Sequence, residues 1–294
     1  MKTRFNEKLI TGFAWLSGLT VLAIFFTVTG FLFLHGYKSL SLNLIFGDTP
    51  PMMALFFKQR VFDGLFPAII GTMTLVLLAV GIAIPLGTAA GIYMAEYCRG
   101  RKKHLLGLFF DILAGIPSIV IGLFGLSVTI FLHRYFFQQL YPSLLISALS
   151  LAFLVLPYLI RSTQGALEDV PLDIRLSAPA MGASRLQNIF MVLLPRSLTG
   201  ISSGILLAIG RCAEDTAVIM LTGVVATAGI PHSLLGNYEA LPFYIYYISS
   251  QYANQQELQS GFGAAIILLV ICTLLFGFAL IIKQHLSRRF FYHL

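Results

Sequence analysis

Long runs without a charged residue are the feature of this 294-residue sequence that most limits its fold. No Asp, Glu, Lys or Arg occurs at positions 9–37, 64–95, 135–160 or 258–282. A helix needs about 20 mostly apolar residues to cross about 30 Å of bilayer hydrocarbon, and each of these runs is long enough. Because only 11% of the residues are charged, against about 25% in a typical soluble domain, most of the chain must be solvated by lipid.

These runs, with two apolar stretches that contain a few charges, predict an all-α integral membrane protein with six transmembrane helices. We expect one transmembrane domain, residues 1–294, with spans at 9–35, 64–93, 106–132, 142–160, 198–224 and 260–282. The third span carries Asp111 near its start, and the fifth is interrupted by Arg211, Glu214 and Asp215.

The positions of Lys and Arg predict the orientation of the chain. Both accumulate in the short cytoplasmic loops of membrane proteins. If the N-terminus is cytoplasmic, 14 of the 19 Lys and Arg residues fall on the cytoplasmic side, and four (Lys38, Lys58, Arg60 and Arg134) on the outer side. We therefore expect both termini in the cytoplasm. The first apolar run is too long for a signal peptide and shows no small-residue cleavage site, so we expect it to remain as an anchor.

Sequence signatures of catalysis are missing. The six His and three Cys show no metal-ligand spacing, and neither a phosphate-binding P-loop nor a Gly-x-Ser-x-Gly elbow occurs. The net charge of +7 follows the loops of a membrane protein and does not indicate nucleic acid. We expect no metal, no cofactor and no hydrolysis of ATP by this chain.

Charged residues inside the fifth span form the first candidate site, Arg211-Cys-Ala-Glu214-Asp215-Thr216. Each charge costs about 2.5–3.5 kcal/mol at the centre of a membrane helix. Spacings of three and four residues place Glu214 and Asp215 on the helix face of Arg211. Two interpretations remain: an ion pair that fixes helix packing, or a polar patch along a translocation path. The charges sum to −1 and would repel an anion. Binding of an anion would therefore require a protonated carboxylate or a further cation from another subunit.

The cytoplasmic segment 161–197 forms the second candidate site. Pro171 is suited to the start of a helix, and Asp173 would lie near the positive end of that helix. Gly182 is suited to ending the same helix in the left-handed conformation. A second, amphipathic helix is expected to run to Pro195, with one apolar face formed by Leu186, Ile189, Phe190 and Leu193. Such a helix-turn-helix suits docking of a soluble partner, although a solvated connector fits the pattern too.

This segment resembles the cytoplasmic motif of ATP-binding-cassette (ABC) importer permeases, which reads Glu-Ala-Ala, three residues, Gly, nine residues, Ile, one residue, Leu-Pro. The second half matches from Gly182 to Leu194 and Pro195. In the first half Leu176-Ser177-Ala178 stands in place of Glu-Ala-Ala, and Pro179 falls inside the helix. The resemblance implies that Ala178, Gly182, Leu194 and Pro195 contact an ATPase.

Other runs resemble the A-type permease of the phosphate importer, the PstA family, over residues 60–290. Arg211-Cys-Ala-Glu-Asp-Thr-Ala217 is similar to the family's Arg-x-Ala-Gly-Glu-Thr-Ala-Pro, with Glu214 in place of Gly, Asp215 in place of Glu and Val218 in place of Pro. Further similar runs are Pro67–Thr72, Pro85–Gly87, Ile92–Tyr97, Leu113–Phe124 and Ala240–Pro242.

The resemblance implies a type I (MetI-like) permease of the bacterial cytoplasmic (inner) membrane that moves inorganic phosphate inward. The implied partners are two ATP-binding cassette subunits, a second, PstC-like permease and a periplasmic phosphate-binding protein. Arg211, Glu214, Asp215 and Thr216 would line the pathway. Small-residue pairs, Gly87 with Gly91 and Gly200 with Gly204, suit close helix packing in such a dimer.

Three other functions compete with this one. The altered charge cluster leaves another oxyanion open as the substrate. A stand-alone secondary transporter or channel would need no ATPase, and residues 161–197 would then dock nothing. A membrane enzyme would need a nucleophile, base or metal constellation, which the sequence does not contain.

Overall fold

The computed structural model describes residues 2–55 and 64–291. The described chain consists of helices and loops, with one isolated β-bridge between Val224 and Tyr238. Six helical segments are long and apolar enough to cross a membrane: Ile10–Ser39, Phe66–Tyr97, Ser118–Tyr135, Leu144–Glu168, Arg185–Glu214 and Gln255–His285. The all-α fold and the number of six membrane helices are confirmed.

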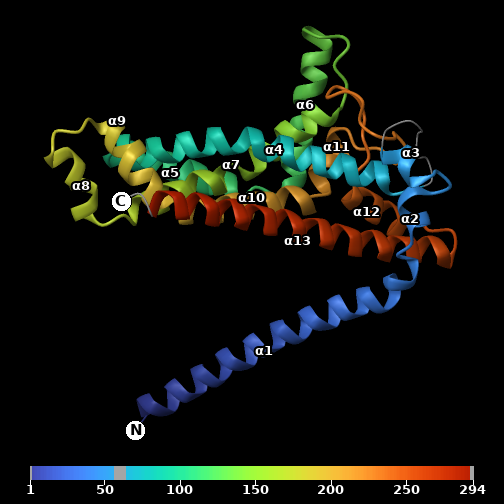
Figure 1. The fold of residues 1–294 in the computed structure, drawn as a ribbon, viewed down its shortest axis with the longest axis horizontal. Coiled ribbons are helices and arrows are strands. Elements are labelled where there is room, and N and C mark those ends of the chain that lie inside the picture. The colour runs from blue at the N-terminus through green and yellow to red at the C-terminus, as the bar shows by residue number, and fades with distance from the viewer. Residues whose placement is uncertain (1, 56–63, 292–294) are drawn as a thin grey trace.

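The long helices are arranged mainly as a bundle (Figure 1). They are α1 (Lys2–Gly36), α4 (Phe66–Ile92), α6 (Ser118–Tyr135), α7 (Leu144–Glu168), α10 (Leu194–Glu214) and α13 (Gln255–Phe291). Shorter α-helices connect them: α2 (Leu42–Phe46), α3 (Pro51–Leu55), α5 (Gly100–Ala114), α8 (Leu172–Ala180), α9 (Arg185–Asn188), α11 (Ala217–Thr222) and α12 (Leu241–Gln251). A 3₁₀ turn covers Tyr37–Ser39, and π turns cover Tyr93–Tyr97 and Ile189–Leu193.

Two of the predicted spans are broken helices. The span expected at 106–132 is divided into α5 and α6 by Gly115-Ile116-Pro117. Proline disfavours helical backbone at the residue before it, so Pro117 ends one helix and precedes the next. The span expected at 198–224 is divided into α10 and α11 at Asp215 and Thr216. In Figure 1, α6 projects at a steep angle from the other helices.

Helix α7 is the centre of the bundle and packs against α4, α10 and α6. Small residues allow this close approach. A Cβ added at Gly87 of α4 would lie 2.6 Å from the Cβ of Leu159, and one at Gly200 of α10 would lie 2.5 Å from the Cβ of Ala166. Gly91 and Gly204 also face α7. The expectation that these glycine pairs serve a dimer is therefore wrong, because they pack α4 and α10 against α7 of the same chain.

Helix α1 diverges from the bundle and meets it near the end of α13 that follows α12 (Figure 1). The contact includes Phe31 and His35 of α1, whose rings lie 5.8 and 5.6 Å from that of Phe262. Side chains nearer the start of α1 are exposed in this chain, for example Phe13 at 72% and Trp15 at 70%. This surface suits lipid or another membrane subunit.

Candidate translocation site and cytoplasmic docking element

Arg211 and Glu214 form an ion pair at the end of α10. Arg211 Nη1 lies 3.0 Å from Glu214 Oε1, across a spacing of three residues. The side chains are 37% and 62% exposed, so the pair lies on an open face of this chain and not in its core. A guanidinium group and one carboxylate are thus held together at the surface of an apolar bundle.

Asp215 does not share this face, contrary to the expectation from its spacing. Helix α10 ends at Glu214, and the extended backbone of Asp215 turns its side chain into the interior, where the residue is 7% exposed. Its Oδ1 accepts a hydrogen bond from Val218 N at 2.9 Å and so caps the start of α11. The i,i+4 rule requires a continuous helix, and the break removes that condition.

Thr216 completes the break between α10 and α11. It is half-buried, and its carbonyl oxygen accepts a hydrogen bond from Met220 N at 3.0 Å. The four cluster residues therefore fall into two groups. Arg211 and Glu214 form an exposed pair of opposite charges, whereas the buried Asp215 and the half-buried Thr216 form a capping turn. The predicted charge of −1 on one face is not present.

The first half of the candidate docking element is α8 and the turn after it. We use the name docking element for residues 172–193, which the sequence predicts to be cytoplasmic. Gly182 has φ +85°, as its predicted role at the helix end requires. Ala183 N donates to Ala178 O at 3.0 Å, and Gly182 N donates to Pro179 O at 2.9 Å. These two bonds form a Schellman motif. Pro171 precedes the first residue of α8, and Asp173 lies in its first turn.

Pro179 inside α8 is compensated by a side chain from α9. A proline has no N–H, so the carbonyl of Arg175, four residues earlier, loses its helical partner. Asn188 Nδ2 donates to that carbonyl at 3.0 Å, and Asn188 is 5% exposed. The departure of Pro179 from the permease motif is therefore accommodated without an unpaired backbone group.

The second half of the docking element differs from the expected amphipathic helix. A capping box between Ser184 and Gln187 starts α9, and the π turn Ile189–Leu193 joins it directly to α10. The helix does not end at Pro195, which lies in the first turn of α10. Leu194 N bonds to Ile189 O, the i to i+5 pattern that rotates the helix by part of a turn.

The expected apolar face is divided in two. Ile189 and Leu193 are buried against Leu167 and Val170 of the bundle end, whereas Leu186 and Phe190 are 59% and 63% exposed. Exposed apolar side chains of this size in one region indicate a protein contact. The full exposed set is Leu172, Leu176, Met181, Leu186, Phe190 and Met191.

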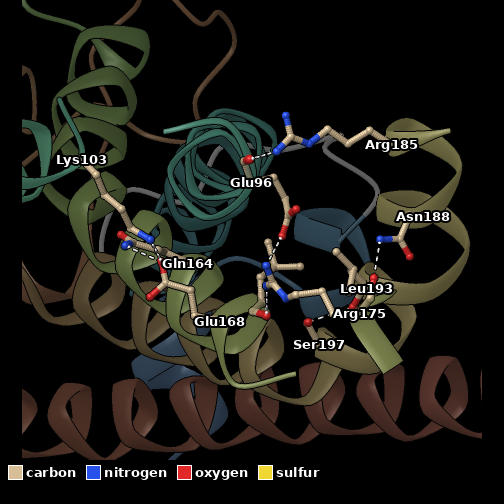
Figure 2. A network of polar contacts seen from close by, with 10 residues as sticks. Glu96, Lys103, Gln164, Glu168, Arg175, Arg185, Asn188, Leu193 and Ser197 are labelled. Carbon is tan, nitrogen blue, oxygen red and sulfur yellow. Dashed lines mark hydrogen bonds and ion pairs between the residues drawn. The ribbon is translucent and has the colours of Figure 1, made fainter. Parts of the chain in front are cut away.

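Sequence reasoning missed a polar network that ties the docking element to the bundle (Figure 2). Arg175 Nη1 lies 3.0 Å from Glu96 Oε1, and Arg175 Nη2 donates to Leu167 O at 2.7 Å. Arg185 Nη2 donates to Glu96 O at 2.6 Å. The available signal was Glu96 itself, which ends a long charge-free run, but no pattern in the sequence identifies its partner.

A second polar ladder joins α5 to α7 at the same end of the bundle. Lys103 Nζ lies 2.7 Å from Glu168 Oε1, which also accepts from Gln164 Nε2 at 2.9 Å. Arg161 holds Asp111 through two hydrogen bonds of 2.8 and 2.5 Å. Asp111, which the sequence places near the start of the third span, is therefore paired.

At the opposite end of the bundle, Glu239 organises the segment before α12. Its Oε1 accepts hydrogen bonds from Ala228 N at 2.9 Å and Gly229 N at 2.7 Å. Burial raises the pKa of the Glu239 carboxyl, and these two hydrogen bonds oppose the rise. Nearby, Thr72 Oγ1 of α4 accepts from Leu241 N at 2.9 Å and fixes the start of α12.

Comparisons with known sequences identify the family of this chain. Residues 87–289 match the family described as "Binding-protein-dependent transport system inner membrane component". The chain is 34% identical over 271 residues to the phosphate transport system permease protein PstA of Yersinia pestis, covering 91% of this chain and 83% of that one. It is 30% identical over 273 residues to PstA of Haemophilus influenzae, covering 92% of each.

Solved structures show the same fold. A chain from the crystal structure of a bacterial alginate ABC transporter, in complex with an alginate pentasaccharide-bound periplasmic protein, aligns with a TM-score of 0.62 at 15% identity. The alignment covers 93% of this chain and 95% of that one. A chain of the MetNI methionine ABC transporter aligns with a TM-score of 0.55 at 17% identity.

Proposed function

This chain belongs to the PstA family of ABC importer permeases, and from that premise we propose that it carries inorganic phosphate inward across the bacterial inner membrane. It is a multi-pass membrane protein and a non-catalytic subunit, since ATP hydrolysis in such importers lies in partner subunits. ABC importer permeases work with ATPase subunits and a substrate-binding protein. Here we propose two ATPase subunits, a PstC-like second permease and a periplasmic phosphate-binding protein.

The exposed Arg211–Glu214 pair carries the proposal. A guanidinium group offers a planar fork of donors that matches phosphate oxygens, and Arg211 presents one on an open face of α10. Glu214 offsets its charge while no substrate is bound. A passing phosphate would compete with Glu214 for the fork, which keeps binding weak enough for release. Asp215 and Thr216 hold the break between α10 and α11 next to the pair.

The docking element supports an ATP-driven importer over a stand-alone transporter or channel. Its exposed Leu, Met and Phe side chains would be unfavourable in water unless a partner covers them. We propose that the ATPase covers them, with Ala178 and Gly182 shaping the turn between the two halves. Leu194 and Pro195 join the docking element to α10.

A second candidate substrate is another tetrahedral oxyanion. Glu214 stands where the PstA pattern has Gly. Its carboxylate lies 3.0 Å from the guanidinium group of Arg211, the group of the pair that attracts anions. An altered counter-charge changes which anion competes best for Arg211.

The test measures uptake of labelled phosphate, sulfate and molybdate by cells that depend on this chain. We expect phosphate uptake, its near-complete loss in Arg211→Ala, and partial recovery in Arg211→Lys, because a point charge lacks the guanidinium fork. Co-purification of an ATPase with the tagged chain should be unchanged in both variants. Uptake of sulfate or molybdate without uptake of phosphate would show that the substrate is another oxyanion. Full phosphate uptake by Arg211→Ala would remove Arg211 from the pathway.

A further inference from the structure

A buried ion pair connects the docking element to α4. The side chains of Arg175 and Glu96 are 20% and 8% exposed, and their charged atoms lie 3.0 Å apart. Arg175 belongs to α8, whereas Glu96 lies in the π turn that extends α4 (Figure 2). Removing one partner of such a pair leaves an uncompensated charge in a region of low dielectric. A substitution that removes one member should therefore destabilise the contact between the two elements.

Arg185 provides a second attachment to the same π turn. It donates to the backbone carbonyl of Glu96 at 2.6 Å, and its guanidinium carbon lies 4.7 Å from the centre of the Tyr97 ring. A contact of this kind adds cation–π attraction. Both halves of the docking element, α8 and α9, thus hold one short stretch of chain at the end of α4.

An apolar layer lies beneath these polar contacts. Ile189 and Leu193 of the docking element are buried with Leu167 and Val170, and Ile92 and Ala95 of the α4 end pack against them. The π turn itself closes with the bond from Cys98 N to Tyr93 O at 3.0 Å. The chain leaves the helix after this turn, since Cys98 has extended backbone. The end of α4 is thus bound on its polar and apolar sides to the docking element.

Helix α4 reaches from this attachment to the opposite end of the bundle (Figure 1). Near its start, Thr72 Oγ1 accepts the hydrogen bond from Leu241 N that fixes α12. Along its length it packs closely on α7 and also contacts α10. One continuous helix therefore links the docking element with the segment around Glu239 and α12.

We propose that Glu96 and Arg175 are positioning residues that lock the docking element to α4, so that displacement of the element by the ATPase moves α4 as one body with it. The inference rests on the proposed docking of an ATPase, but not on phosphate as the substrate. In this chain α8 has Leu176, 60% exposed, where the permease motif has Glu. The inward-facing Arg175 beside it supplies the charged link to α4.

A role in folding alone makes a different prediction from a role in coupling. Replacing both members of a buried ion pair by apolar residues of similar size is often neutral or stabilising, whereas losing one member is not. The double variant Glu96→Leu with Arg175→Met should therefore restore folding and assembly. If the pair only supports folding, this double variant also restores activity. If the charged pair is needed to transmit movement of the docking element to α4, the activity of the double variant stays low.

The experiment uses the complex that co-purifies with the tagged chain, reconstituted in liposomes. Hydrogen exchange of residues 93–98 and of 172–190 is measured with and without ATP and vanadate, in wild type, Glu96→Gln and the double variant. In wild type, ATP should change exchange in both segments. In both variants it should change exchange in 172–190 alone. Lys103→Gln, which breaks a neighbouring, more exposed ion pair outside the docking element, is the matched control and should behave as wild type.

ATP hydrolysis gives the second readout on the same preparations. We expect the stimulation of hydrolysis by phosphate with the binding protein, relative to the basal rate of the same preparation, to fall on the order of tenfold in both variants, within the range of such couplings. Failure of phosphate to stimulate the wild-type complex would count against the proposed substrate and leave the exchange test standing. The inference is overturned by wild-type exchange at 93–98 in Glu96→Gln, by wild-type activity in the double variant, or by failure of both variants to assemble.

Discussion

At the scale of single residues, two positions derive their roles from backbone geometry. Gly182 occupies a left-handed conformation that residues with a Cβ rarely adopt. Asp215 ends α10 and caps α11, although its sequence neighbours suggest a transport role for its charge. Substitutions at each position separate a conformational role from a chemical one.

Gly182→Val should weaken docking without preventing membrane insertion. A β-branched residue at φ +85° is strained by about 1–2 kcal/mol or more, so the Schellman turn should open. We expect normal amounts of chain in the membrane, with reduced ATPase co-purification and uptake. Gly165→Val is the matched control, because Gly165 is helical and an added Cβ would meet no atom within 4 Å. Normal ATPase co-purification by Gly182→Val would show that this turn is not needed for docking.

Asp215→Asn should retain transport and stability, whereas Asp215→Ala should lose about 1 kcal/mol of stability through loss of the cap. An Asn side-chain oxygen can accept the hydrogen bond from Val218 N, but it carries no charge. Thermal unfolding in detergent and phosphate uptake measure the two effects. Loss of uptake in Asp215→Asn at unchanged stability would assign the carboxylate charge to the pathway.

At the scale of elements, breaks in helices place the functional groups. Pro117 separates α5 from α6, Asp215 separates α10 from α11, and a π turn at Ile189–Leu193 rotates the docking element relative to α10. Packing against Leu167 and Val170 buries Ile189 and Leu193. Leu186 and Phe190, on the same predicted apolar face, remain exposed.

The joint between α8 and α9 can be tested by a double-mutant cycle on Pro179 and Asn188. Asn188→Ala should leave the Arg175 carbonyl unpaired and cost about 1–3 kcal/mol. Pro179→Ala restores an N–H that can bond to the same carbonyl, so the double variant should be more stable than Asn188→Ala alone. Protease resistance of the 161–197 segment and ATPase co-purification provide the measurements. Additive effects of the two substitutions would contradict this account.

At the scale of the whole molecule, the arrangement of the ends agrees with the orientation expected from Lys and Arg. The beginning of α1 and the end of α13 lie at the same end of the molecule as α8 and α9, while α2, α3 and α12 lie at the other (Figure 1). The two ends of the described chain and the docking element therefore lie at one end of the molecule (Figure 1). The positive-inside rule predicts that this end is cytoplasmic.

Cysteine-accessibility labelling in intact cells should confirm this orientation. Cysteines introduced at Lys102 and Arg185 should react only after the membrane is permeabilised, and one at Glu239 should react from outside. Arg60, a further position expected outside, lies beyond the described residues. Labelling of position 185 from outside would overturn the assignment of every later span.

The sequence by itself determined the features that depend on local composition. Four charge-free runs and two apolar stretches with few charges indicated six membrane helices, because each charge in hydrocarbon costs free energy in its own segment. Gly182 predicted the turn of the docking element for a similar reason. The left-handed backbone conformation that it adopts depends on the residues next to it in the chain. The same local reasoning predicted that Arg211 and Glu214 would share a face of α10, and they do.

Only the tertiary structure decided which residues meet across the fold. Glu96 and Arg175 are far apart in the sequence, and their pairing depends on how α8 folds back on α4. The glycine pairs could serve a contact within or between chains, and the position of α7 decided that they pack inside this one. Asp215 left the face of Arg211 because the helix ended before it. Periodicity extends only as far as a helix continues, and where a helix ends or rotates is decided by the packing around it.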